Sequence, residues 1–370
     1  MNILHVCSNY YPSNGGPQYT LKHVSEKLIE YYNDKVAVAT TDAYYGTESR
    51  LFKKVNPSFE ILNGVEVNRF PYTKWYFPLI KYGGKIYGKM SGKSLPYSII
   101  KKRSGLESPG IMKFMDNSAA DAIMATTILY NFCDYPFFRF KTKNPKPFIL
   151  YGSIHLHNSL PYEHPFLKRA RACDCYIANT EFEKNELINL GIDGTKIVAI
   201  GSGIEYRNFV VSEKEIASFK QKNGIEEDDI VIGYIGRLIK GKGVAILLEA
   251  FKKIYTTNQK VKLLLAGATT DFVPQIKKII HEKSLPVILI ENFDEAQKPL
   301  LYNILNIFIL ASQSESFGVS FLEAWACKKP VVATDMGATA SLLSEGTDSF
   351  LFPKDDVNDL VKKIEVLINN

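Results

Sequence analysis

Two cations stand beside a glycine-bearing loop in the second half of the chain. Residues 236–243 read GRLIKGKG, nearly the phosphate-binding loop G-x-x-x-x-G-K-[S/T], but Gly243 stands where a hydroxyl would bind magnesium. A strand-like run precedes the loop and a helical pattern follows it, a context in which backbone N–H groups bind phosphate. Arg237 and Lys242 therefore predict a site that holds a diphosphate by direct charge pairing, without a metal. The alternative is a tight turn with basic residues on its surface.

Two glutamates lie eight residues apart in the segment 311–334, ASQSESFGVSFLEAWACKKPVVAT. Residues 316–318 are typical of a loop that leads into a helix near Val319. Glu315 then follows a strand and Glu323 lies on the second helical turn, so both carboxylates can face a ligand at the helix start, where free N–H groups attract anions. The alternative is that Glu315 caps the helix and Glu323 is solvated.

The elements that must position these residues alternate between strand-like and helical patterns, which indicates an α/β fold with parallel sheets. The first series of strands is 2–7, 35–40, a hairpin at 59–70, 121–126, 147–152, 175–179 and 196–201. The second series is 229–236, 261–267, 286–291, 306–311, 330–335 and 349–353. Two series predict two Rossmann-like domains, residues 1–205 and 206–370, facing across a cleft. Open α/β sheets bind ligands at the carboxyl ends of their strands, so the cleft is the expected site.

Composition restricts the class of protein. The net charge of +6 is too small to indicate a nucleic-acid partner, although it suits anionic ligands. No run approaches the roughly 20 apolar residues that span a bilayer, and the N-terminal residues are typical of a strand rather than a signal peptide. The five cysteines are odd in number and lack C-x-x-C spacing, which predicts free thiols in the cytoplasm.

One segment is strongly basic. Residues 67–106 contain nine Lys or Arg and no Asp or Glu, with tyrosines and glycines between them. The segment is either a solvated insertion or a docking surface for anionic lipid headgroups or a phosphate-bearing acceptor. The second interpretation predicts peripheral contact with the inner face of an anionic membrane.

The two chemistry-bearing segments together resemble the signatures of the retaining, GT-B-fold glycosyltransferases of family 4, also called group 1. Their typical pattern is P-S-x-x-E-x-F-G-x-x-x-x-E-A-x-A-x-G-x-P-V. This chain matches it at Ser312, Glu315, Phe317, Gly318, Glu323, Ala324, Ala326, Pro330 and Val331. The family's G-R-L-x-x-x-K-G element is matched at Gly236, Arg237, Leu238, Lys242 and Gly243. The likeness continues through Pro12, Gly15-Gly16 and residues 177–209.

The resemblance implies roles for these residues. Arg237 and Lys242 would neutralise the diphosphate of a nucleotide-sugar and stabilise it as it leaves. Glu323 would accept hydrogen bonds from the ribose hydroxyls, and Glu315 would bind hydroxyls of the donor sugar. The backbone N–H groups of Phe317, Gly318 and Val319 would help to hold sugar and phosphate, and Gly16 would approach the diphosphate from the acceptor-binding N-terminal domain.

The resemblance also implies a histidine beside the reacting sugar. His155 and His157 follow the strand-like run 147–152, and His155 lies nearer the expected position. A metal site is the alternative, because His155, His157, His164, Cys173 and Cys175 cluster in sequence, but their spacing matches no zinc pattern. We therefore expect no metal and no cofactor. The expected reaction is same-face transfer from a nucleotide-diphosphate sugar to a glycan or lipid-linked acceptor, with the anomeric configuration retained.

Three departures from the family pattern stand out. Lys328-Lys329 replaces the glycine before Pro330, Ser202 replaces an asparagine, and the sequence ends at Asn370, where family members continue into a helix that crosses back to the N-terminal domain. We expect that crossover helix to be missing. Alternative functions are a nucleotide-sugar epimerase, a phosphorylase-like enzyme, or a non-catalytic module that binds sugar or membrane.

Overall fold

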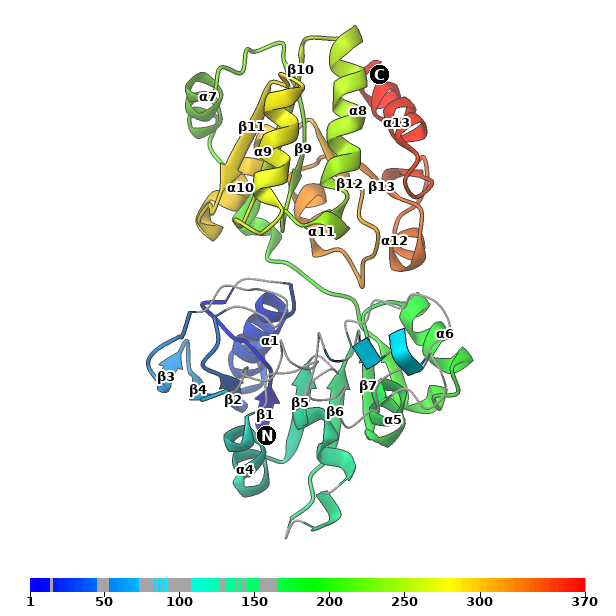
Figure 1. Cartoon of the computed structure of the whole chain (residues 1–370). Helices are drawn as coiled ribbons and strands as arrows, with labels where there is room; N and C mark the ends of the chain where they lie inside the picture. The colour runs from blue at the N-terminus through cyan, green and yellow to red at the C-terminus, as the bar shows by residue number, and fades with distance from the viewer. Residues whose placement is uncertain are drawn as a thin grey trace. The chain divides into compact units, whose positions relative to one another are not determined.

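The computed structural model describes residues 1–13, 16–44, 53–72, 83, 86–87, 89–91, 108–126, 131–137, 139–141, 144–152 and 165–369. The chain divides into two compact units, Met1–Gly201 and Ser202–Asn370 (Figure 1). This division lies just before the domain boundary that the sequence predicts after residue 205. His155, His157 and His164, and most of the basic segment 67–106, lie outside the described residues.

The N-terminal unit is built on an eight-stranded sheet of order β3-β4-β2-β1-β5-β6-β7-β8. Its strands are β1 (Asn2–Val6), β2 (Lys35–Thr41), β3 (Phe59–Leu62), β4 (Val65–Phe70), β5 (Ala122–Thr126), β6 (Phe148–Tyr151), β7 (Cys175–Ala178) and β8 (Ile197–Ala199). Its helices are α1 (Gly16–Tyr32), α4 (Pro109–Asn117), α5 (Pro165–Ala172) and α6 (Glu181–Asn189). Only β3 and β4 pair antiparallel among these strands, as the predicted hairpin.

The C-terminal unit is built on a fully parallel six-stranded sheet of order β11-β10-β9-β12-β13-β14. Its strands are β9 (Ile230–Ile235), β10 (Val261–Gly267), β11 (Val287–Glu291), β12 (Ile307–Leu310), β13 (Val331–Thr334) and β14 (Ser349–Phe352). Its helices are α7 (Glu213–Lys222), α8 (Val244–Thr257), α9 (Val273–Glu282), α10 (Lys298–Ile304), α11 (Val319–Ala326), α12 (Gly337–Leu342) and α13 (Val357–Asn369).

Helix α8 packs on this sheet through apolar residues that recur at helical spacing. Leu247, Phe251 and Ile254 recur at intervals of three or four residues and are buried, so one stripe of the helix faces the core. In Figure 1, α8 and α9 lie on the same face of the sheet, with α13 beside α8. Strands β12 and β13 are buried along their whole length, as is typical of a parallel sheet covered on both faces.

The buried apolar residues form separate clusters, and each cluster stays inside one unit. One cluster runs from Phe209 to Ile364 in the C-terminal unit. Two others lie in the N-terminal unit, one between Leu4 and Ile197 and one between Cys7 and Tyr151. Each unit therefore has a hydrophobic core of its own.

Helix α7 forms where the sequence shows no apolar periodicity. Its start is fixed by a capping box, in which the Ser212 hydroxyl accepts from the Glu215 N–H and the Glu215 carboxylate accepts from the Ser212 N–H. Such a box satisfies two N–H groups that a helix start otherwise leaves open. Local capping thus fixes the start of this helix, and the partly buried Ile216 and Phe219 pack it against the core of the C-terminal unit.

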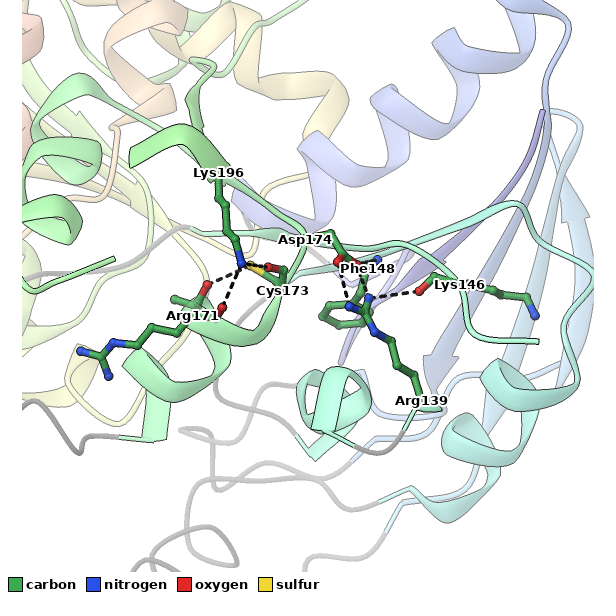
Figure 2. A network of polar contacts seen from close by, with 8 residues as sticks. Arg139, Lys146, Phe148, Arg171, Cys173, Asp174 and Lys196 are labelled. Atoms are coloured by element: carbon green, nitrogen blue, oxygen red, sulfur yellow. Dashed lines mark hydrogen bonds and ion pairs between the residues drawn. The ribbon is translucent and has the colours of Figure 1, made fainter. Parts of the chain in front are cut away.

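A set of polar contacts joins the amino ends of β6, β7 and β8 (Figure 2). Asp174, directly before β7, accepts hydrogen bonds from both terminal guanidinium nitrogens of Arg139 and, at 2.7 Å, from the backbone N–H of Phe148. Lys196, directly before β8, donates to the carbonyls of Arg171 and Cys173, both at 3.4 Å. We call this set the amino-edge network.

Electrostatics in the amino-edge network follow from these contacts. The hydrogen bond from Arg139 lowers the pKa of Asp174, against the opposing effect of partial burial. The same bond raises the pKa of Arg139. Within the described part of the chain, no helix is both long and apolar enough to cross a bilayer.

Candidate active site

The two loops singled out by sequence leave neighbouring strands of the C-terminal sheet. Strand β9 pairs with β10 on one side and with β12 on the other, so the order of strands along the chain reverses between β9 and β12. Loop 236–243 follows β9 and loop 311–318 follows β12, and both leave at the carboxyl edge of the sheet. This is the topological switch point, where open α/β sheets bind ligands.

Hydrogen bonds fasten the two loops to each other. The backbone N–H of Gln313 donates to the Gly241 carbonyl at 2.9 Å, and the Ser312 hydroxyl lies 3.3 Å from the same oxygen. The Lys242 ammonium donates to Glu315 Oε1 at 2.5 Å. Residues 73 positions apart in sequence are thereby brought into direct contact.

Gly243 explains why the loop lacks a magnesium-binding hydroxyl. Its φ of 69° lies in the left-handed region, and a Cβ built on it would come within 1.8 Å of the Ala311 carbonyl oxygen. Any side chain here would therefore collide with the backbone that follows β12, and the left-handed conformation itself disfavours residues other than glycine. The glycine is required by the packing of the two loops.

The Lys242–Glu315 pair is partly withdrawn from water. The side chains are 15% and 8% exposed. At this depth an ion pair is screened less than on the surface, and removing one partner leaves the other charge in a costly position. Lys242 is thus more than the surface cation of a tight turn, and the alternative that Glu315 caps the following helix is wrong, because Gly318 occupies the N-cap position.

Helix α11 begins at Val319, as the sequence predicts. Gly318 has a φ of 94°, and a Cβ on it would lie 2.4 Å from the Phe321 ring. Phe317 is buried beside it. The chain therefore turns sharply between Glu315 and the first turn of α11, and it points the N-terminus of that helix toward the carboxyl edge.

Glu323 is held by two side chains of α10. Lys298 Nζ lies 3.2 Å from its Oε1, and the Tyr302 hydroxyl donates to its Oε2 at 2.8 Å. Lys298 also pairs with Glu295 at 2.6 Å. Because Glu323 is buried, the alternative that it is a solvated helix position is wrong. We call Lys298, Tyr302 and Glu323 the α10 clamp.

Burial and charge act in opposite directions on the α10 clamp. Burial raises the pKa of Glu323, and the charge of Lys298 and the hydrogen bond from Tyr302 only partly offset it. For Lys298, burial alone would lower the pKa, but the carboxylates of Glu323 and Glu295 outweigh it and raise the pKa. Lys298 therefore stays charged and favours the ionised form of Glu323.

Tyr234 on β9 lies close enough to Glu315, Arg237 and Glu323 for their charges to act on it. Its buried hydroxyl donates to the Arg237 carbonyl at 3.2 Å, which fixes the start of loop 236–243. Burial, together with the charges of Glu315 and Glu323, raises the pKa of Tyr234, while Arg237 lowers it. The Arg237 side chain is exposed at the carboxyl edge. Tyr234 is thus a neutral hydrogen-bond donor in the middle of the site.

The other predicted site residues lie in the N-terminal unit. Gly16 begins α1 after the loop that follows β1, and a Cβ on it would meet no atom within 4 Å. His155 lies outside the described residues. Among the residues that are described, no group of three or more His, Cys, Asp or Glu side chains is arranged to hold a metal ion.

Lys298, Tyr302 and Tyr234 are site residues that sequence reasoning missed. A signal existed for two of them, because Lys298 and Tyr302 are four residues apart and share one face of α10. Nothing in the sequence indicates that this face meets Glu323. That contact depends on how α10 packs beside α11.

Part of the chain that contains this site is similar to a known protein family. Residues 215–370 match the family described as Glycosyl transferases group 1. The match includes both loops of the switch point and the α10 clamp. It supports the resemblance predicted from sequence at the level of a GT-B glycosyltransferase.

Two curated relatives show the range of similar proteins. The capsular polysaccharide biosynthesis glycosyltransferase CapM of Staphylococcus aureus is 29% identical over 201 residues, which cover 52% of this chain and 52% of CapM. The alpha-monoglucosyldiacylglycerol synthase of Acholeplasma laidlawii is 27% identical over 197 residues, covering 52% of this chain and 48% of the synthase. The chain spans about half the length of these relatives.

A solved structure agrees over the whole chain. The crystal structure of Anabaena HepE in complex with UDP and glucose has a TM-score of 0.72 and 20% identity, and it covers 100% of this chain and 90% of HepE. The predicted fold class, α/β with two Rossmann-like domains of the GT-B type, is confirmed.

Proposed function

We propose that this protein is a retaining glycosyltransferase of family 4, which moves a sugar from a nucleotide-diphosphate donor to a glycan or lipid-linked acceptor without a metal ion. The observation that carries the proposal is the contact between Lys242 and Glu315 at the switch point, 2.5 Å apart. It joins the two signature loops inside the segment that matches the glycosyl transferases group 1 family.

The charges fit the bond that must break. When the anomeric C–O bond of the donor breaks, its electron pair leaves with the diphosphate and positive charge develops on the sugar. Lys242 has three N–H donors, of which one is directed at Glu315, and the others can contact a phosphate oxygen. Arg237 adds a second cation at the same edge. Oriented charges of this kind stabilise a leaving group, as a metal does elsewhere.

The acceptor oxygen then bonds to the anomeric carbon on the face from which the diphosphate departs, and the acceptor's proton passes to the departing phosphate. Glu315 would hold sugar hydroxyls and Glu323 the ribose hydroxyls. Since CapM is named for capsular polysaccharide biosynthesis and the Acholeplasma enzyme for a diacylglycerol product, glycans and lipids are the acceptors to test first. HepE was solved with UDP and glucose, so UDP-glucose is the first donor to test.

A donor screen tests the proposal. Binding by the folded protein raises its melting temperature by mass action, so one nucleotide-sugar should stabilise the full chain in a thermal-shift assay. With that donor, transfer to glycan and diacylglycerol acceptors should continue in excess EDTA, and NMR should show the donor's anomeric configuration in the product. An inverted product, or donor turnover that requires phosphate, would contradict the proposal.

We also propose that the protein is cytoplasmic and contacts the inner face of an anionic membrane through the basic segment 67–106. In the described part of this segment, Ile86 and Met90 are 59% and 84% exposed, and Lys89 is exposed beside them. Apolar residues among lysines suit a lipid headgroup layer. Binding to anionic vesicles should be lost as salt increases, and absence of binding at low salt would count against the contact.

A further inference from the structure

A carboxylate can bind hydroxyl groups without the two side-chain partners that Glu323 has in the α10 clamp. Glu323 is 10% exposed and Lys298 18% exposed, and the Tyr302 ring is buried. A buried carboxylate on α11 could be satisfied by backbone N–H groups. Here each of its two oxygens instead meets a different side chain of α10.

Both partners of Glu323 are fixed in place. The Tyr302 ring packs against Phe209 at 6.1 Å and Phe308 at 5.4 Å between ring centroids, so its hydroxyl cannot move away from Glu323. Lys298 is held from its other side by Glu295. The carboxylate plane of Glu323 is therefore set before any ligand arrives, which reduces the conformational entropy lost on binding.

The free acceptor positions of Glu323 match a pair of hydroxyls. A carboxylate has about four acceptor positions, two on each oxygen. Lys298 and Tyr302 use one on each oxygen, so one on each remains. Two neighbouring acceptors in one fixed plane suit two neighbouring hydroxyls, such as the cis-diol of a ribose.

We propose that Lys298 and Tyr302 are positioning residues that keep Glu323 ionised and oriented, so that the site selects ribonucleotides over 2′-deoxyribonucleotides. This inference rests on the proposed function, because it needs a nucleoside diphosphate as ligand. Neither residue needs to touch the ligand. Their effect passes through the carboxylate they hold.

The test compares paired ligands on the full chain by titration calorimetry. The tightest binder among UDP, GDP and ADP is measured against its 2′-deoxy counterpart. The wild-type protein should prefer the ribonucleotide about tenfold, because a hydrogen bond to a charged group is lost with the hydroxyl. In Lys298→Met the preference should fall to about twofold or less, and Lys298→Arg should restore most of it.

Two further variants separate positioning from folding. Tyr302→Phe keeps the packed ring and loses one hydrogen bond, so it should reduce the preference even if Lys298→Met folds poorly. Lys260→Met removes a lysine whose only ion pair in the described residues is with the exposed Asp228 at 2.7 Å, and it should keep the wild-type ratio. An unchanged ratio in both Lys298→Met and Tyr302→Phe would overturn the inference while leaving the proposed function intact.

The pH dependence of nucleotide affinity gives a second test of the inference. The titratable groups that face Glu323 are Lys298, Glu295, Tyr302, Tyr234 and Cys327. Without Lys298 the pKa of Glu323 rises further, so nucleotide affinity in Lys298→Met should begin to fall at a higher pH than in the wild type. If the wild-type chain binds none of the three nucleoside diphosphates, both the proposed function and this inference fail.

Discussion

Two groups of ion pairs in this molecule use similar residues at opposite edges of their sheets. In the amino-edge network of the N-terminal unit, Asp174 pairs with Arg139 and also accepts from the Phe148 N–H, and Lys196 donates to the carbonyls of Arg171 and Cys173. At the carboxyl edge of the C-terminal unit, Lys242 and Glu315 bind each other, as do Lys298 and Glu323. The first group satisfies groups that strand ends leave open.

The hydrogen bonds between Lys242 and Glu315 and within the α10 clamp join side chains to side chains, and none of them satisfies a backbone group at a strand end. Burying a charged pair costs desolvation free energy that apolar packing would avoid. Charged pairs retained at a switch point, where side chains need not close the sheet, are therefore better explained by a ligand than by stability. The comparison predicts that variants at the carboxyl edge change activity, and that variants at the amino edge change stability.

The largest effect is expected for Lys242→Ala. Removal of one preorganised charge at a developing anion lowers kcat by about 10²–10³-fold. Sugar transfer by the purified variant measures it. Lys240→Ala is the matched control, because Lys240 is exposed on the same loop, and it should transfer at the wild-type rate.

Lys242→Ala also leaves Glu315 buried without its partner, so stability must be measured beside activity. The double variant Lys242→Ala/Glu315→Gln removes both charges and should recover the melting temperature but not the turnover. Recovery of transfer together with stability would show that the pair is structural, and the contrast between the two edges would disappear.

The next effect concerns the missing hydroxyl. Gly243→Ser should reduce the free energy of unfolding by more than about 2 kcal/mol, because a left-handed residue costs about 1–2 kcal/mol and the Cβ also meets Ala311. Urea unfolding measures this. Gly241→Ser is the control, since a Cβ on Gly241 meets nothing within 4 Å. Equal stability of the two variants would refute the packing explanation for Gly243.

At the amino edge, Asp174→Asn should lower the free energy of unfolding by about 1 kcal/mol, a value limited by the 42% exposure of the side chain. Folding lowers the pKa of Asp174, so its contribution is present above the unfolded pKa of about 3.9 and is lost as the pH falls through the folded value. The difference from wild type should therefore shrink between pH 5 and 3 in urea unfolding. Nucleotide affinity at pH 7 should not change; a loss would contradict the comparison.

The last effect, similar in size to that of Asp174→Asn, belongs to neither network. Lys328 has a φ of 57°, in the left-handed region, at the position where the family pattern has glycine. Lys328→Gly should stabilise the protein by about 1 kcal/mol. Lys252→Gly, at an exposed position within α8, should instead destabilise the protein by about 1 kcal/mol. Thermal unfolding measures both variants. If both substitutions shift the melting temperature in the same direction, the backbone argument is wrong.

Much of the fold follows from local patterns. Apolar runs bounded by loops predict the strands of both sheets to within one or two residues, and the start of α11 at Val319 is predicted as well. The alternation of strands with helices then predicts parallel sheets, and in such sheets ligands bind at the carboxyl ends of the strands. Loops 236–243 and 311–318 could thus be assigned to one site before their contact was known.

Contacts that depend on how helices pack could not be predicted. Lys298 and Tyr302 reach Glu323 from 25 and 21 residues away, through the placement of a seven-residue helix whose sequence carries no family signature. The reason why residue 243 is a glycine could not be predicted either, because it depends on the position of the Ala311 backbone. A missing hydroxyl can be seen in the sequence, whereas the atom that excludes it cannot.

The separation of the hydrophobic cores has a consequence for the engineering of this protein. Among the described residues, no cluster of buried apolar side chains is shared between Met1–Gly201 and Ser202–Asn370, so exchanging one unit should leave these clusters of the other unit intact. Chimeras joined near residue 201 are therefore expected to fold. If the proposed function is correct, such chimeras would test whether the N-terminal unit sets the choice of acceptor while loops 236–243 and 311–318 keep the choice of donor.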